Sequence, residues 1–136
     1  MTSELRRTIQ SRAQGCCEYC RAQEKYSHDP FSAEHIIPIS KGGKDISENL
    51  AWSCFGCNLH KYTATEGLDI VTGVLATLFH PRLERWDDHF RWDSSFTIII
   101  GLSPTGRATI NRLKLNRPGL VNLRAVLESC GKHPPE

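Results

Sequence analysis

The sequence has no long hydrophobic run and no recognisable secretion signal. Its apolar stretches all fall short of the roughly 20 residues that a transmembrane helix requires. The opening residues, Met-Thr-Ser-Glu-Leu-Arg-Arg, contain no apolar core of the kind found in signal peptides. Internal repeats and low-complexity tracts are also absent from the sequence. We therefore expect a cytoplasmic protein that has no membrane partner.

The net charge is also small. A formal charge of +2 does not indicate nucleic-acid binding on its own, because affinity for a phosphate backbone depends on local clusters of basic residues. The stretch 107–124 is such a cluster, since it contains no acidic residue. Its basic residues are Arg107, Arg112, Lys114, Arg117 and Arg124. This pattern is consistent either with a solvated face or with a surface that contacts phosphate.

Cysteine is the residue type whose spacing is most informative. Two Cys-x-x-Cys motifs are present, and in a chain without a secretion signal such pairs favour metal binding over disulfides. Four thiolates complete a tetrahedral zinc site and leave no open position for water, so we expect a structural Zn²⁺. A thioredoxin-like redox role is disfavoured because neither motif lies in that strand–helix context. The expected ligands are Cys17, Cys20, Cys54 and Cys57, while Cys16 and Cys130 are left over.

The N-terminal half is predicted to contain short elements around the two cysteine motifs. Residues 3–14 resemble a polar helix with Ser3 as its N-cap. Residues 31–37 are apolar and β-branched near their end, so they predict a strand that stops at Pro38. A loop containing Gly42 and Gly43 follows. We expect a helical turn from Ser47 through Trp52, and a helix from about residue 57 past Lys61.

The C-terminal half is predicted to form a hairpin and helices. Residues 68–79 favour a helix, although Gly73 weakens it. Strands are expected at 96–102 and 107–115, joined by a turn at 104–106. A last helix is expected to have Asn116 as its cap, Pro118 in its first turn, and a buried stripe formed by Leu120, Leu123 and Leu127. These elements predict an α+β fold.

The residues between and after the cysteine motifs resemble a known family. The pattern is Cys-x2-Cys, then Glu34-His35-Ile-x-Pro-x3-Gly-Gly, then Asn49-Leu, then Cys-x2-Cys-Asn-x2-Lys. It is similar to the HNH endonucleases, which implies a ββα-metal fold, in which two strands and a helix surround a catalytic cation. The pattern covers residues 17–61. The tail, with Phe79-His-Pro-Arg82 and Gly106-Arg-Ala-Thr, also resembles small stand-alone bacterial HNH proteins.

The length of 136 residues predicts a single domain, and the resemblance implies roles for particular residues. We expect one domain over 1–136, with a zinc-stabilised catalytic core at 1–65 and a β-hairpin and helix packed against it at 66–136. His35 would be the general base, since an imidazole suits proton transfer from water at neutral pH. Glu34 and Asn58 would bind Mg²⁺ or Mn²⁺ through hard oxygen donors. Asn49 would tie the Gly-Gly loop to the backbone near His35, and Lys61 would contact a phosphate oxygen.

Three questions stay open at the level of sequence. Adjacent residues on a regular strand point to opposite faces, so Glu34 and His35 share one site only if the strand twists, bulges or ends there. His60 is two residues from Asn58 and is expected to point away from the cation as a surface residue. The expected substrate is DNA, and the chain is either a monomer or a dimer. The alternative function is a zinc-ribbon module that binds nucleic acid or protein without catalysis.

Overall fold

Short helices and antiparallel strand pairs alternate along residues 1–135, the part of the chain that the computed structural model describes. The helices are α1 (Ser3–Arg12), α2 (Phe55–Lys61), α3 (Trp86–His89), α4 (Pro104–Leu113) and α5 (Pro118–Ser129). The strands are β1 (Ser32–His35), β2 (Leu50–Ser53), β3 (Glu66–Asp69), β4 (Val74–Thr77), β5 (Phe90–Trp92) and β6 (Ile99–Gly101). The α+β class is therefore confirmed. None of the described helices is long and apolar enough to span a membrane.

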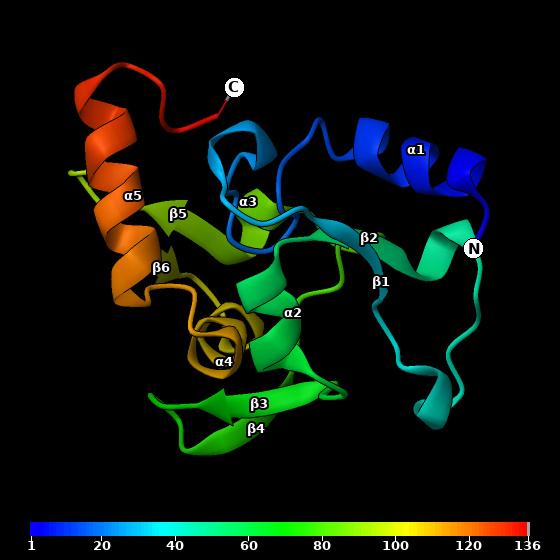
Figure 1. Ribbon diagram of the computed structural model, residues 1–136. Helices are drawn as coiled ribbons and strands as arrows, with labels where there is room; N and C mark the ends of the chain where they lie inside the picture. The colour runs from blue at the N-terminus through cyan, green and yellow to red at the C-terminus, as the bar shows by residue number, and fades with distance from the viewer. Residues whose placement is uncertain (136) are drawn as a thin grey trace.

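The strands pair as β1–β2, β3–β4 and β5–β6, each antiparallel. In the first pair Ser32 lies opposite Ser53 and His35 opposite Leu50. Helix α2 follows β2 directly, so β1, β2 and α2 form the expected ββα unit. In Figure 1, α2 lies between α4 and the β1–β2 pair, and β3–β4 runs below α4. The three sheets are small, and buried side chains between them supply the packing.

The core runs through both halves of the chain. Trp52, Tyr19 and Phe31 are almost fully buried in the N-terminal half, and Phe90 and Leu113 in the C-terminal half. All five belong to one cluster of buried side chains. Burial of such large apolar groups is the main stabilising contribution in a fold with few long elements.

Several N-terminal elements differ in detail from the prediction. Helix α1 is present, but Thr2 rather than Ser3 is its N-cap, and its hydroxyl accepts from Leu5 N at 3.1 Å. The expected helical turn at 47–52 is wrong beyond Asn49. A 3-10 turn covers only Ser47–Asn49, and β2 begins at Leu50. Helix α2 begins two residues earlier than predicted, at Phe55.

The predicted helix at 68–79 is wrong, because residues 68–77 belong to the β3–β4 hairpin. The carbonyl of Asp69 accepts from Gly73 N at 2.8 Å, and its carboxylate accepts from Val71 N at 3.0 Å. Gly73 adopts a φ of 72°, which glycine tolerates without strain. These interactions close a tight turn that a helix would not contain.

The predicted strand at 107–115 is also wrong, because α4 covers Pro104–Leu113. Ser103 is its N-cap and accepts from Gly106 N at 3.0 Å, while Pro104 occupies the first turn. The strand expected at 96–102 is present as β6, and its partner is β5.

Helix α5 also differs from the prediction, except that Pro118 does lie in its first turn. Arg117, not Asn116, is its N-cap. The Asn116 side chain bridges to β6, accepting from Ile99 N and donating to Ile99 O. Of the expected stripe, Leu120 is buried, while Leu123 and Leu127 are half-buried.

Candidate active site and metal centre

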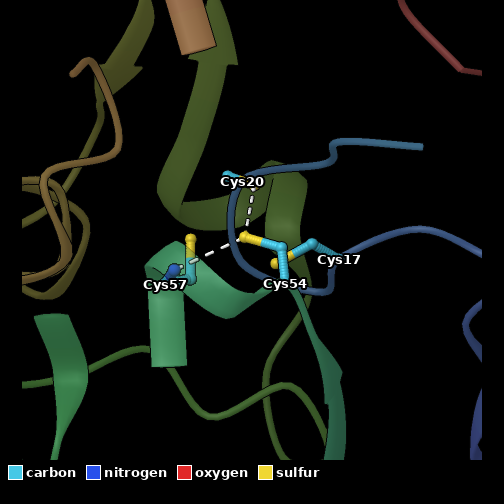
Figure 2. Close-up of side chains that lie close together, drawn as sticks. All are labelled: Cys17, Cys20, Cys54 and Cys57. Atoms are coloured by element: carbon cyan, nitrogen blue, oxygen red, sulfur yellow. Dashed lines mark hydrogen bonds between the residues drawn. The ribbon is translucent and has the colours of Figure 1, made fainter. Parts of the chain in front are cut away.

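The four motif cysteines converge on one buried cluster. Their sulfur atoms all lie within 4.8 Å of one another, and the side chains point toward a common centre (Figure 2). Cys20 Sγ and Cys54 Sγ are 3.7 Å apart. Two ligands of a tetrahedral zinc with Zn–S bonds near 2.3 Å are about 3.8 Å apart, so the spacing fits zinc. The cluster is thus positioned to bind a structural metal ion such as zinc.

The second cysteine pair is placed by the junction between β2 and α2. Cys54 is the N-cap of α2, and its sulfur accepts from Cys57 N at 3.4 Å. This contact places the side chains of Cys54 and Cys57 on one side of the first helical turn. The first pair lies in the tight segment between α1 and the 3-10 turn Glu24–Tyr26, closed by a bond from Cys17 N to Ala22 O.

Two arginines from the C-terminal half contact this cluster, and sequence reasoning did not identify them. Arg117 donates to Cys54 Sγ at 3.5 Å and to Cys57 Sγ at 3.6 Å. Arg124 is buried and donates to the carbonyls of Leu115 and Cys20. Four thiolates around a divalent cation carry excess negative charge, which these guanidinium groups offset. The absence of acidic residues in 107–124 was the sequence signal that could have indicated this charge-compensating role.

Glu34 lies on β1 near Lys61 of α2. Glu34 Oε1 accepts from Ser32 Oγ at 2.6 Å, which puts the two side chains on one face of the strand. Lys61 is only 4% exposed, and its ammonium donates to Ile36 O at 2.8 Å. Burial lowers the pKa of Lys61 to about 8, although the nearby Glu34 carboxylate opposes the shift. Lys61 thereby joins α2 to the end of β1.

His35 is the last residue of β1, and its ring is held by a carboxylate. His35 Nε2 lies 3.0 Å from Asp45 Oδ1. In the tautomer in which Nε2–H donates to Asp45, Nδ1 keeps its lone pair. Asp45 was not predicted from the sequence, and its position ten residues beyond His35 gave no motif signal. The strand ends at His35, as sharing a site with Glu34 would require, but no hydrogen bond in 1–135 links His35 to Glu34.

Asn49 closes the loop that follows His35. Its amide accepts from Ile37 N at 2.9 Å and donates to Ile37 O at 3.0 Å and Lys44 O at 2.8 Å. A Cβ on Gly43 would lie 1.8 Å from Ile37 O, so only glycine fits this closure. The loop that carries Asp45 is therefore held against the end of β1.

Asn58 lies on α2 one turn before Lys61 and is half-buried. Its side-chain amide makes no hydrogen bond within the described residues, including to Glu34 or His35, so its oxygen is free to bind a ligand. His60 is half-buried rather than a simple surface residue, and its carbonyl accepts from Arg112 Nε at 3.1 Å.

Residues 17–63 match the family model described as HNH endonuclease. The match begins at the first ligand cysteine and includes Glu34, His35, Asn49 and Asn58. No curated protein and no solved structure matched the chain. The ββα order of β1, β2 and α2 around the cysteine cluster agrees with that match. Residues 17–63 are therefore similar to the HNH endonucleases, a family of nucleases that act on nucleic acids.

Proposed function

We propose that the chain is a divalent-metal-dependent endonuclease that hydrolyses DNA phosphodiester bonds, with His35 as general base. The contact between His35 and Asp45 carries this proposal. A carboxylate that accepts from Nε2–H leaves Nδ1 to take a proton from the attacking water. The same carboxylate stabilises the imidazolium that results.

Glu34 and Asn58 are the proposed protein ligands of Mg²⁺ or Mn²⁺. Glu34 Oε2 and the Asn58 side-chain oxygen have no hydrogen-bond partner among residues 1–135, and both are hard donors suited to these cations. When bound, such a cation offsets the negative charge that develops on the phosphate and the leaving oxygen. Zn²⁺ in the four-cysteine cluster is proposed to be structural, because its sulfur shell is closed.

Asn49 and Lys61 are proposed to position these groups. Asn49 fixes the loop between His35 and Asp45 through its bonds to Ile37 and Lys44. Lys61 fixes α2, and hence Asn58, against β1. An ammonium has three donors, so Lys61 retains protons with which to contact a phosphate oxygen after bonding to Ile36.

Supercoiled plasmid incubated with Mg²⁺ or Mn²⁺ tests the proposal. We expect nicked or linear product only when a divalent cation is added. His35→Ala should lower the cleavage rate by about 10²- to 10⁴-fold, because the proton acceptor is lost. Zinc content and DNA binding should be retained, since His35 is partly exposed and makes no side-chain hydrogen bond to the cysteines within the described residues.

An unchanged cleavage rate in His35→Ala would refute the assignment of the base. Wild-type protein that binds DNA but never cleaves it with either cation would instead favour the alternative, a zinc-ribbon binding module. The binding-module alternative requires the four cysteines but gives no functional role to Glu34, His35 or Asn58.

A further inference from the structure

A groove lies where α2, α4 and the β3–β4 hairpin meet, and it extends to the start of α5 (Figure 1). It consists of two hollows of about 460 Å³ and about 360 Å³, which we together term the α4 groove, and they share the lining residues His60, Asn111 and Lys114. Its cations are Arg112, Lys114 and Arg117, and Glu66 is the one acid among the lining residues that the structure describes. The groove therefore carries net positive charge.

Two cations of the α4 groove have donors that the fold does not use. Lys114 is exposed, and its ammonium forms no hydrogen bond or ion pair within residues 1–135. Arg112 is also exposed, and its Nε donates to His60 O at 3.1 Å, which leaves the N–H groups of both terminal nitrogens without partners in the described residues. Arg117 differs, because its guanidinium donates to Cys54 and Cys57. Lys114 and Arg112 are therefore the groups with which the groove can bind an anion.

Lys114 occupies a backbone position that favours glycine. It is the C-cap of α4, and its φ of 54° and ψ of 52° lie in the left-handed region. Its backbone N–H donates to Ile110 O, which glycine would do equally well. A positive charge near a helix C-terminus adds little at an exposed site, whereas glycine avoids the strain of the left-handed conformation. The fold alone therefore does not explain a lysine at this position.

The α4 groove begins beside the residues that are proposed to bind the catalytic cation. His60, which lines both hollows, follows Asn58 by two residues on α2. Arg112 and Glu34 both lie close enough to Lys61 to act on its pKa, Glu34 raising it and Arg112 lowering it. A DNA strand that is longer than the cleaved phosphodiester has to continue over the neighbouring surface, and the groove is such a surface.

We propose that the α4 groove binds the backbone of the DNA beyond the phosphodiester that is cleaved, with Lys114 and Arg112 contacting its phosphates. Leu68 is 43% exposed and Leu75 is 61% exposed in the same groove, so apolar surface adjoins the cations. A DNA strand, in which uncharged sugars alternate with phosphates, fits this combination better than a continuously acidic peptide does. The position beside the cleaved bond rests on the proposed nuclease function. Phosphate contacts carry no sequence information, so the groove contributes affinity rather than specificity.

Lys114→Gly removes the charge at a position where glycine suits the backbone. Measured in a His35→Ala background, so that the DNA stays intact, it should weaken binding of a fluorescent duplex oligonucleotide by about threefold or more at low salt. The slope of log affinity against log salt should become less steep by about 0.9, the value for one lost phosphate contact. Lys114→Arg, which keeps the charge, should retain binding. The midpoint of thermal unfolding of Lys114→Gly should equal or exceed that of its parent.

Arg7→Ala is the matched control for the loss of one positive charge. Arg7 is exposed on α1, which lies apart from α4 and the β3–β4 hairpin in Figure 1. Its side chain forms no hydrogen bond or ion pair within the described residues, and alanine is a good helix former. Arg7→Ala should therefore leave both the affinity for the oligonucleotide and the salt dependence unchanged.

Each other outcome has a distinct meaning. Unchanged affinity in Lys114→Gly would overturn the phosphate contact and leave the nuclease proposal intact. Equal losses in Lys114→Gly and Arg7→Ala would show an effect of net charge, and a lower midpoint of thermal unfolding in Lys114→Gly would show a structural lysine, and either result would overturn the inference. Polyglutamate that competes as well as DNA of equal charge would also overturn it, because the groove would then bind any polyanion. Wild-type protein that never cuts plasmid, combined with the expected affinity loss, would refute the nuclease but support DNA binding by the groove.

Discussion

At the scale of single residues, Asp45 contacts the group on which the proposed chemistry depends. Removing its carboxylate leaves His35 free to rotate and to exchange tautomers. We expect Asp45→Ala to reduce the single-turnover rate of plasmid cleavage by about 10- to 100-fold, as for other partners that orient a functional group. Zinc content and circular dichroism should not change, because Asp45 is exposed.

Glu48→Ala is the matched control for that substitution. Glu48 is an exposed acid on the same segment, and within the described residues it forms no hydrogen bond or ion pair with His35. Equal losses of activity in Glu48→Ala and Asp45→Ala would attribute the effect to general surface charge and would contradict the orienting role.

The residues of the site differ in how far sequence could predict them. Four of them could be predicted because they belong to one sequence motif with short spacings. These are Glu34, His35, Asn49 and Asn58. The roles of Asp45 and Arg117 could not be predicted, since their contacts depend on how a loop and a distant helix pack. The basic stretch 107–124, which the sequence left open between a solvated face and a surface that contacts phosphate, illustrates the same limit. Arg117 and Arg124 turn toward the cysteines and the core instead.

At the scale of elements, the β3–β4 hairpin shows why the apolar composition of residues 68–79 predicted the wrong element. On β3 the buried positions are Gly67 and Asp69, while Leu68 is exposed. A Cβ on Gly67 would lie 2.8 Å from Ala108 O, so glycine permits the close contact with α4. The apolar side chains therefore face outward, which reverses the alternation that identifies a strand. At α4, Ser103 and Pro104 start a helix, whereas the sequence analysis had placed a turn at 104–106 and a returning strand after it.

Asp69 connects this hairpin to α4. Its buried carboxylate accepts from Arg107 Nε at 2.8 Å and from Arg107 Nη2 at 3.0 Å, and it accepts from Thr72 Oγ1 in the turn. Asp69→Asn leaves Arg107 without its charged partner. We expect the midpoint of thermal unfolding at pH 7 to fall by about 5 °C or more. Asp29→Asn, at an exposed acid, should have little effect.

Acid should remove the difference between wild type and Asp69→Asn. The hydrogen bonds from Arg107 hold the pKa of the Asp69 carboxyl well below its usual value. Because the unfolded pKa is near 4, the stabilisation is complete above about pH 4 and is lost as the pH falls further. Urea unfolding between pH 2 and 7 measures this. A difference in unfolding free energy between wild type and Asp69→Asn that stays constant from pH 2 to 7 would contradict the prediction.

At the scale of the whole molecule, contacts between the two halves converge on the first cysteine motif. Trp86 Nε1 donates to Tyr19 O at 2.9 Å, and Arg82 forms an ion pair with Glu18. Glu18 also accepts from Trp52 N at 2.8 Å on β2. With Arg117 on the second motif, the C-terminal half thus contacts both cysteine pairs. This connectivity follows from tertiary packing, and the prediction of one domain with a core at 1–65 did not include it.

Removal of zinc should therefore unfold both halves together. Without the metal, four buried sulfur atoms lose their common ligand, and the segments that carry Tyr19, Glu18 and the start of α2 lose their anchor. Chelator-driven zinc release and tryptophan fluorescence, measured in a Trp52→Phe background so that only Trp86 and Trp92 report, should change with the same time course. Cys57→Ser should behave as the zinc-free protein does, whereas Cys130→Ser should remain native because Cys130 is exposed and is not one of the four clustered cysteines. Complete zinc loss with native fluorescence from the C-terminal tryptophans would mean that this half folds independently.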